Sequence, residues 1–154
     1  MRVAAISDPD SPAPGSWQRF LDIHLVDVSV FAPRLGYVTA KGVPVLGPDS
    51  ILVHMAASPV RVRSWASAAE WLPDVAAEVT TAMIVDELQE RPKTVAARIG
   101  YLLQGLRPDI AEQIAGPSTK TWFGPRATVI RHDSRWQVAD TLLPFDPRTL
   151  ERAI

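Results

Sequence analysis

Three histidines could serve as metal ligands or proton carriers, but each stands alone in the sequence. His24, His54 and His132 lack a second histidine at the short spacing that zinc ligands use. The chain has no cysteine, which excludes disulfides, cysteine-based zinc sites and cysteine nucleophiles. The Gly-x-Ser-x-Gly turn of hydrolases, a glycine-rich phosphate loop and the signature set of protein kinases are absent too. No catalytic site of a known local signature is therefore supported, although a triad can be assembled from distant residues.

Basic and aromatic residues near the C-terminal end indicate a different chemistry. Six such side chains are interspersed there, namely Lys120, Trp122, Arg126, Arg131, Arg135 and Trp136. Cationic groups next to aromatic rings suit phosphate-rich or acidic partners. We therefore predict a partner-binding surface at these residues. A second interpretation stays open, in which a β hairpin turns its aromatic residues inward and its arginines outward.

The charges of the chain are unevenly distributed. The 154 residues carry 16 basic and 17 acidic side chains, for a formal net charge of −1, which disfavours a uniformly cationic nucleic-acid binder. The formal charge is −5 over residues 1–90, +5 over 91–135 and −1 over 136–154. A protein of this kind can still meet an acidic partner through one face, unless folding intermixes the segments.

Composition and length set the broad class of the protein. The apolar share of 47% is that of a folded chain, and the length fits one ordinary domain. No apolar run approaches the ~18 residues of a transmembrane helix, and the first residues lack the layout of a signal peptide. We expect a cytoplasmic protein that has no membrane partner and binds no metal.

The apolar pattern predicts an α+β fold with a β-rich first part, central helices and a C-terminal β hairpin packed with the helices. Residues 1–16 include a proline-rich stretch and are expected to form a flexible lead-in or linker, which leaves 17–154 as a single domain. The expected strands of the first part cover residues 21–31, 35–40, 43–46, 51–56 and 60–65.

The period of the apolar residues changes after residue 65. Ser67 and Glu70 form a capping box that predicts a short helix, which Pro73 is expected to end. Asp74 can cap the next helical segment, and Thr80 is expected to interrupt it. Several short helices are therefore predicted in this region.

The clearest helical pattern follows Pro92, and a β region follows it. Apolar residues recur there at helical spacing, namely Val95, Ile99, Leu102, Leu103 and Leu106. Gly100 interrupts the pattern and indicates close packing against that side of the helix, and Pro108 opens a further short helix. Strands are then expected at 119–123, 126–131 and 136–138, with a turn at 132–135.

A known family shares this order of elements. The segment Arg98-Ile99-Gly100-Tyr101-Leu102 is followed by Lys120-Thr-Trp-Phe-Gly-Pro-Arg126 and by Ser134-Arg-Trp-Gln-Val138. From about residue 57 to 147 the chain thereby resembles the C-terminal antitoxicity region of AbiEi-type antitoxins, which belong to bacterial toxin–antitoxin and phage-defence pairs. In that family an Arg-hydrophobic-Gly-Tyr-Leu helix precedes a β hairpin.

The resemblance implies a toxin as partner and two domains with different functions. Such antitoxins typically pair a winged-helix DNA-binding domain with an antitoxicity domain, counter a nucleotidyltransferase-like toxin and repress their own operon. Residues 1–56 do not resemble a helix-turn-helix, so we expect this chain to be the antitoxicity portion. DNA is then a partner only if a winged-helix domain precedes this region. The family's basic face is carried over to the basic residues between positions 120 and 135.

Three hypotheses of function remain. The first is a non-enzymatic antitoxin domain without a cofactor, which neutralises the toxin by contact or by acting on the toxin's RNA target. The second is an atypical kinase that phosphorylates a serine of the toxin and needs ATP with a divalent metal. The third is a DNA-binding autoregulator of the operon. The sequence leaves open whether the protein is an enzyme, and it identifies no catalytic residue.

Overall fold

The computed structural model of the chain describes residues 3–7, 23–27, 37–40 and 43–150, with side chains described from residue 47 onward. The chain divides into two compact units, Met1–Ile51 and Leu52–Ile154, and each is described by itself. The division into a lead-in at 1–16 and one domain at 17–154 stays a prediction, because residues 8–16 lie outside the described part.

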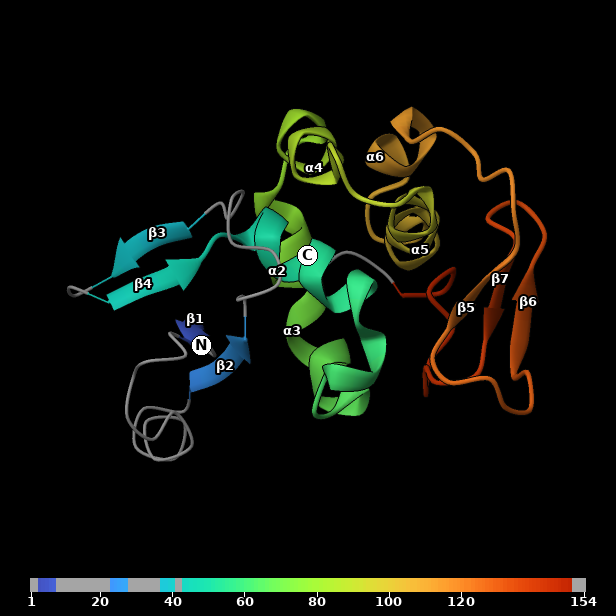
Figure 1. Cartoon of the computed structure of the whole chain (residues 1–154), viewed down its shortest axis with the longest axis horizontal. Coiled ribbons are helices and arrows are strands. Elements are labelled where there is room, and N and C mark those ends of the chain that lie inside the picture. Colours follow the sequence, from blue (N-terminus) through green and yellow to red (C-terminus); the bar gives the residue numbers. More distant parts are fainter. Residues whose placement is uncertain (1–2, 8–22, 28–36, 41–42, 151–154) are drawn as a thin grey trace. The chain divides into compact units, whose positions relative to one another are not determined.

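The first unit contains strands β1 (Val3–Ser7), β2 (Ile23–Asp27), β3 (Tyr37–Ala40) and β4 (Val43–Leu46). They form one sheet of order β2-β1-β4-β3 (Figure 1). β1 runs parallel to β2, and β4 runs antiparallel to β1 and β3. That the first part of the chain as a whole is β-rich stays a prediction.

Residues 51–56 are helical and do not form the predicted strand. They belong to helix α2 (Pro48–Ala57), which begins at a proline and carries an acidic residue in its first turn, both typical of helix starts. Leu52 and Val53 are fully buried. A short unbroken apolar run fits a buried strand and a buried helix equally well, so periodicity could not decide between them.

The predicted strand at 60–65 is also wrong. A 3-10 turn, η2 (Pro59–Arg61), is followed there by helix α3 (Trp65–Glu78). Val60, the first residue of the predicted strand, is 62% exposed. The helix is capped by Ser64, whose hydroxyl accepts a hydrogen bond from the backbone N–H of Ser67 at 3.1 Å. The cap therefore lies three residues before the predicted one.

Pro73 lies inside α3 and does not end it, and Asp74 begins no new helix. A proline in a helix interior costs about 3 kcal/mol, because it removes one backbone hydrogen bond and crowds the preceding turn. Ala68, Leu72 and Ala76 are buried on both sides of Pro73 at helical spacing. An uninterrupted helix keeps this whole stripe in the core, and burial outweighs the local cost.

The remaining helices agree with the sequence pattern. They are α4 (Thr81–Leu88), α5 (Lys93–Leu103) and α6 (Pro108–Gln113). The interruption at Thr80 is confirmed, because its side chain caps α4 by accepting a hydrogen bond from the backbone N–H of Met83 at 3.2 Å. The apolar stripe of α5 is confirmed as core, with Ile99, Leu102 and Leu103 fully buried.

The C-terminal strands are β5 (Thr121–Phe123), β6 (Arg131–Asp133) and β7 (Val138–Asp140). They form a sheet of order β5-β7-β6, in which β7 is parallel to β5 and antiparallel to β6. β7 lies between β5 and β6, so the two strands that follow each other in the sequence are not neighbours in the sheet. The described part of the chain is therefore an α+β fold whose hairpin, β6 with β7, belongs to a three-stranded sheet.

The turn of this hairpin lies at 134–137, and not at the predicted 132–135. The Asp133 carboxylate accepts a hydrogen bond from the backbone N–H of Trp136 at 3.0 Å, and Gln137 adopts a φ of +49°. An aspartate that bonds backbone N–H groups a few residues ahead stabilises a turn. The predicted strand at 126–131 accordingly forms only from Arg131 onward.

The C-terminal sheet packs against α5, as Figure 1 shows. The Trp136 indole lies directly over Gly100, where a Cβ atom would overlap the ring. The Phe123 ring lies 5.4 Å from that of Trp65 and 5.7 Å from that of Tyr101. The helix glycine noted in the sequence is thus explained by the close approach of Trp136.

We predict that Gly100→Ala destabilises the fold by about 1–3 kcal/mol, because the added methyl group overlaps Trp136. This is opposite to helix propensity, which favours alanine by about 1 kcal/mol. Gly116→Ala is the matched control, since its Cβ would meet nothing within 4 Å. Urea unfolding measures both variants, and a Gly100→Ala protein as stable as the original would contradict the close contact.

Candidate partner-binding site

The strand register assigns each residue of the C-terminal sheet to a face. Trp122, Ala139 and His132 form one row across the three strands. Because side chains alternate along a strand, the rows on either side point the opposite way. These rows are Thr121 with Val138 and Asp133, and Phe123 with Asp140 and Arg131. We call the face of the Trp122 row the outer face and the opposite face, which packs on α5, the inner face.

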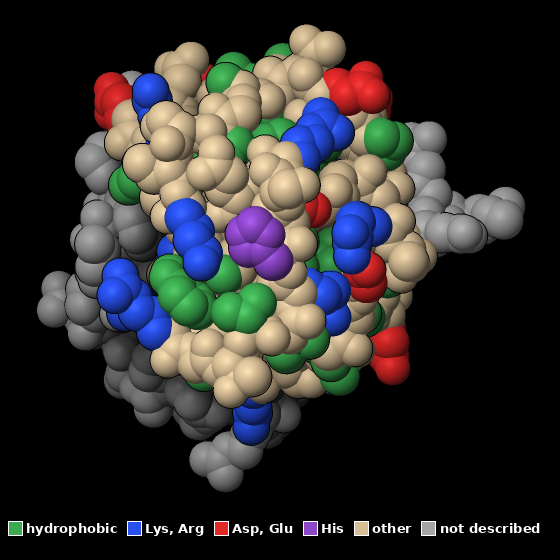
Figure 2. Space-filling view, turned by 90° about the vertical axis from the view of Figure 1, so that its right-hand side faces the viewer, with side chains coloured by type: hydrophobic (Ala, Val, Ile, Leu, Met, Phe, Trp, Pro, Cys, Tyr) green, Lys and Arg blue, Asp and Glu red, His purple; other side chains and the backbone are tan. Residues whose placement is uncertain are grey.

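Three of the predicted cations are exposed, and one of them, Lys120, contacts the aromatic residue of the outer face. The Lys120 ammonium is 5.3 Å from the centre of the Trp122 ring, which is a cation–π distance. Arg126 follows β5, and Arg135 lies in the β6–β7 turn. The Arg135 guanidinium carbon is 5.0 Å from the centre of the Trp136 ring, which packs on α5. In Figure 2, Lys and Arg side chains surround a histidine on this side, while most Asp and Glu side chains lie toward its edges.

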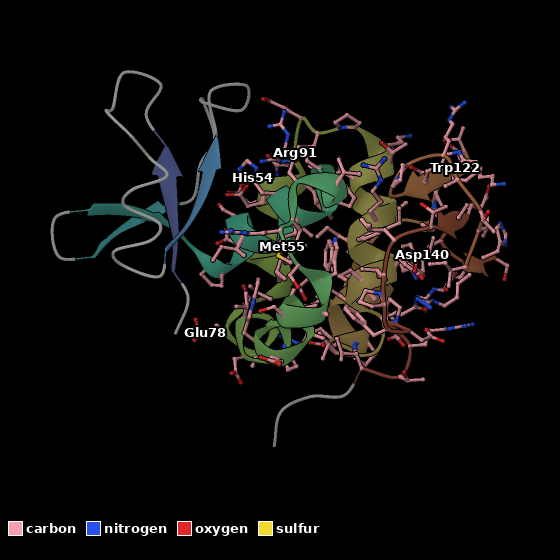
Figure 3. The ribbon with its side chains drawn as sticks, turned by 90° about the horizontal axis from the view of Figure 1, so that it is seen from below. His54, Met55, Glu78, Arg91, Trp122 and Asp140 are labelled. Atoms are coloured by element: carbon pink, nitrogen blue, oxygen red, sulfur yellow. The ribbon has the colours of Figure 1, made fainter. Side chains whose placement is uncertain are left out.

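Trp122 is held in place through its backbone. Its carbonyl oxygen accepts a hydrogen bond from Arg98 Nε at 2.9 Å, and Arg98 also donates to the carbonyls of Ala56 and Ala57 at 3.3 and 3.2 Å. Burial lowers the pKa of the Arg98 guanidinium from its ordinary value. One arginine of α5 thus joins the end of α2 to β5 and positions Trp122, whose location Figure 3 marks.

The structure places Arg131 on the inner face, away from the predicted surface. Its terminal nitrogen donates to the carbonyls of Leu143 and Phe145 at 2.5 and 2.8 Å. Its Nε lies 3.4 Å from a carboxylate oxygen of Asp140, and its side chain is only 18% exposed. Trp136 is 1% exposed and packs on the helix, so neither side chain is available to a partner.

Asp140 is the centre of the inner face. Its fully buried carboxylate accepts a hydrogen bond from the Tyr101 hydroxyl at 2.6 Å and from the backbone N–H groups of Leu142 and Leu143 at 2.9 Å each. Burial and this carboxylate raise the pKa of Tyr101 above its ordinary value, so the phenol stays protonated as a donor. Figure 3 marks Asp140 between α5 and the strands.

Three residues of this surface were missed from the sequence. His132 lies in the outer row, and Val129 and Ile130 before β6 are 41% and 56% exposed. The sequence placed His132 in a turn and the two aliphatic residues in a strand. Their positions follow from the register of β6, which begins at Arg131, and a shift of one residue would reverse the face on which each lies.

The described residues contain neither a metal-binding cluster nor a membrane-spanning helix. Within them, no three His, Asp or Glu side chains gather as a metal site. No helix of this part is both long and apolar enough to cross a membrane. His54 is buried in α2.

The comparison with protein families agrees with the resemblance noted in the sequence. Residues 25–105, more than half of the chain, match the AbiEi antitoxin C-terminal domain, and the chain belongs to this family. The match begins and ends earlier than the expected span of 57–147. It includes the Arg98–Leu102 segment of α5, and the C-terminal sheet lies outside it.

A solved structure has a similar fold. The RV2827C protein from Mycobacterium tuberculosis is similar to this chain with a TM-score of 0.59 and 20% sequence identity. The similarity covers 92% of this chain and 56% of that chain, so this chain spans little more than half of that protein's length. At this identity the likeness concerns the fold alone. No curated protein matches the chain in sequence.

We predict that Arg131→Gln destabilises the protein by about 2–4 kcal/mol, because it leaves the buried Asp140 carboxylate and two carbonyls without their cation. Arg126→Gln is the control and changes stability by at most ~0.5 kcal/mol, since this side chain is exposed. Denaturant unfolding of both variants measures the difference. Equal effects would contradict the inner position of Arg131.

We predict that stability falls in acid because of His54. Burial, with a contribution from Arg91 that Glu87 opposes, lowers the pKa of His54 from 6.5 to about 4. Between these pH values the unfolded chain binds a proton that the folded chain does not, so stability decreases as the pH falls from about 6.5 to 4. The full loss is about 3 kcal/mol.

The measurement compares denaturant unfolding of the original protein and His54→Gln at pH 7 and pH 4.5. Glutamine does not titrate, so the decrease at pH 4.5 should be smaller for the variant by about 2–3 kcal/mol. Parallel pH profiles for the two proteins would rule out this role of His54.

Proposed function

We propose that this domain neutralises a nucleotidyltransferase-like toxin through the outer face of its C-terminal sheet, by contact with the toxin or with the toxin's RNA target. Membership in the AbiEi antitoxin family supports the antitoxin role. The observation that carries the proposed surface is the contact of the exposed Lys120 with the half-buried Trp122, together with the exposed Arg126 and Arg135 in the segments that follow β5 and precede β7.

The outer face has the composition of a binding surface. Aromatic residues and arginines are enriched where proteins contact partners, and each guanidinium can form paired hydrogen bonds with a carboxylate or a phosphate. The exposed Val129 and Ile130 add apolar contact area beside the cations. Arg131 and Trp136 do not belong to this surface, because Arg131 donates a hydrogen bond to the Leu143 carbonyl on the inner face and Trp136 is buried.

The two alternatives from the sequence stay predictions. A kinase acting on the toxin would need a site for ATP and a divalent metal, and an operon regulator would need a DNA-binding surface. No observation on the described residues favours either function over the antitoxin role. The family's connection with phage defence is likewise a prediction for this chain.

The test is rescue of bacteria from the cognate toxin. We predict that the triple variant Lys120→Glu/Arg126→Glu/Arg135→Glu loses rescue by at least tenfold in colony count, because reversed charges repel an acidic or phosphate-bearing partner. The control is Arg61→Glu/Arg63→Glu, which reverses two exposed arginines outside the C-terminal sheet and should rescue fully.

Unfolding curves of both variants establish that each remains folded. Full rescue by a folded triple variant would refute the proposed surface. Loss of rescue in the control as well would show that general surface charge is responsible, and that the outer face has no special part.

A further inference from the structure

The C-terminal sheet separates its charges by face. Its two described carboxylates, Asp133 and Asp140, lie on the inner face and are 6% and 0% exposed. The Asp140 carboxylate accepts hydrogen bonds from Tyr101 and from backbone N–H groups. The Asp133 carboxylate accepts hydrogen bonds from Gln104 and from the backbone N–H of Trp136. The outer row contains no carboxylate. A polyanion approaching this face therefore meets cations without repulsion from the strands beneath.

The cations lie beyond both ends of the strands of the sheet. Lys120 precedes β5, and Arg135 lies in the turn that leads into β7, which is parallel to β5. These two residues are therefore at one end of the sheet. Arg126 follows β5 and lies toward the other end. The arrangement provides positive charge along the strand direction, which suits a chain of successive negative charges better than a single anion.

An aromatic platform lies between these cations. Trp122 and His132 lie on the edge strands of the outer row, on either side of Ala139, which is fully buried, so the accessible aromatic surface of the row is that of Trp122 and His132. Aromatic side chains on a sheet surface bind unstacked bases by stacking, while nearby cations bind the backbone. The carboxylates of an acidic protein would form ion pairs with the cations, but they could not stack on the indole ring.

We propose that the outer face binds single-stranded nucleic acid, with one base stacked on Trp122 and backbone phosphates on Lys120, Arg126 and Arg135. This proposal rests on the proposed function in using the same face, and it names the ligand of that face. Base-paired nucleic acid is a poor ligand, because its bases are already stacked and cannot reach the indole.

The probes are fluorescein-labelled oligouridylate and oligothymidylate of about 12 nucleotides, a length within the range that one such surface covers. Fluorescence anisotropy should show binding that weakens with salt, with a logarithmic slope near −2 for three phosphate contacts and a slope smaller by about 0.7 for Arg135→Gln. Comparison of the two oligonucleotides shows whether the natural ligand is RNA or DNA.

The stacking step is tested at Trp122. Trp122→Ala should weaken binding about 10- to 100-fold, whereas Trp122→Phe, which keeps a ring, should lose much less. Arg61→Gln/Arg63→Gln is the control and should bind like the original protein. An RNA duplex and polyglutamate should both bind more weakly than the single strands.

The proposal is overturned if neither oligonucleotide binds, if polyglutamate binds equally well, or if Trp122→Ala has no effect. Its failure can be distinguished from failure of the proposed function. If the triple charge reversal abolishes rescue although no oligonucleotide binds, the outer face contacts the toxin protein. If the same variant loses oligonucleotide binding but still rescues, the face binds nucleic acid without serving neutralisation.

Discussion

The buried carboxylate of Asp140 is the constraint on which the C-terminal half of the structure depends. A carboxylate without solvent contact is tolerated only when hydrogen bonds and an opposite charge compensate its lost hydration. Tyr101 from α5, two backbone N–H groups and Arg131 supply these partners. The pairing joins the helix to β7 and β6. It also removes Arg131 from the surface, so the cations that remain exposed are those outside the inner face.

The Arg98–Leu102 segment of α5, which carries the family resemblance, attaches the helix to the C-terminal sheet. Within little more than one turn of α5, Arg98 binds the carbonyl of Trp122, Gly100 makes room for Trp136, and Tyr101 binds Asp140. Each residue contacts a different part of the C-terminal sheet. The segment therefore attaches the C-terminal sheet to α5.

The features that could be predicted from the sequence are those that depend on neighbouring residues. The apolar stripe of α5 and the threonine cap of α4 were found because periodicity and capping are properties of neighbouring residues. Residues 51–56 were assigned to a strand because an unbroken apolar run fits either element. Pro73 was expected to end a helix, because its local preference could be weighed but the burial of the flanking stripe could not.

The candidate site was predicted in composition but not in geometry. Basic and aromatic residues between positions 120 and 136 were recognised as a group, yet Arg131 and Trp136 point into the core. The side on which a strand residue points depends on register, and a shift of one residue reverses it. The turn at 134–137 fixes that register, because the Asp133 carboxylate accepts a hydrogen bond from the backbone N–H of Trp136.

The most direct test of this division between an inner and an outer face is hydroxyl-radical footprinting of Trp122 and Trp136. The protein is examined alone and together with its purified cognate toxin and the toxin's RNA target. We expect Trp136 to be protected in both samples and Trp122 to be oxidised in the protein alone but protected with the partners. Rapid oxidation of Trp136 in the folded protein, or an unchanged rate at Trp122 when partners are added, would contradict the account.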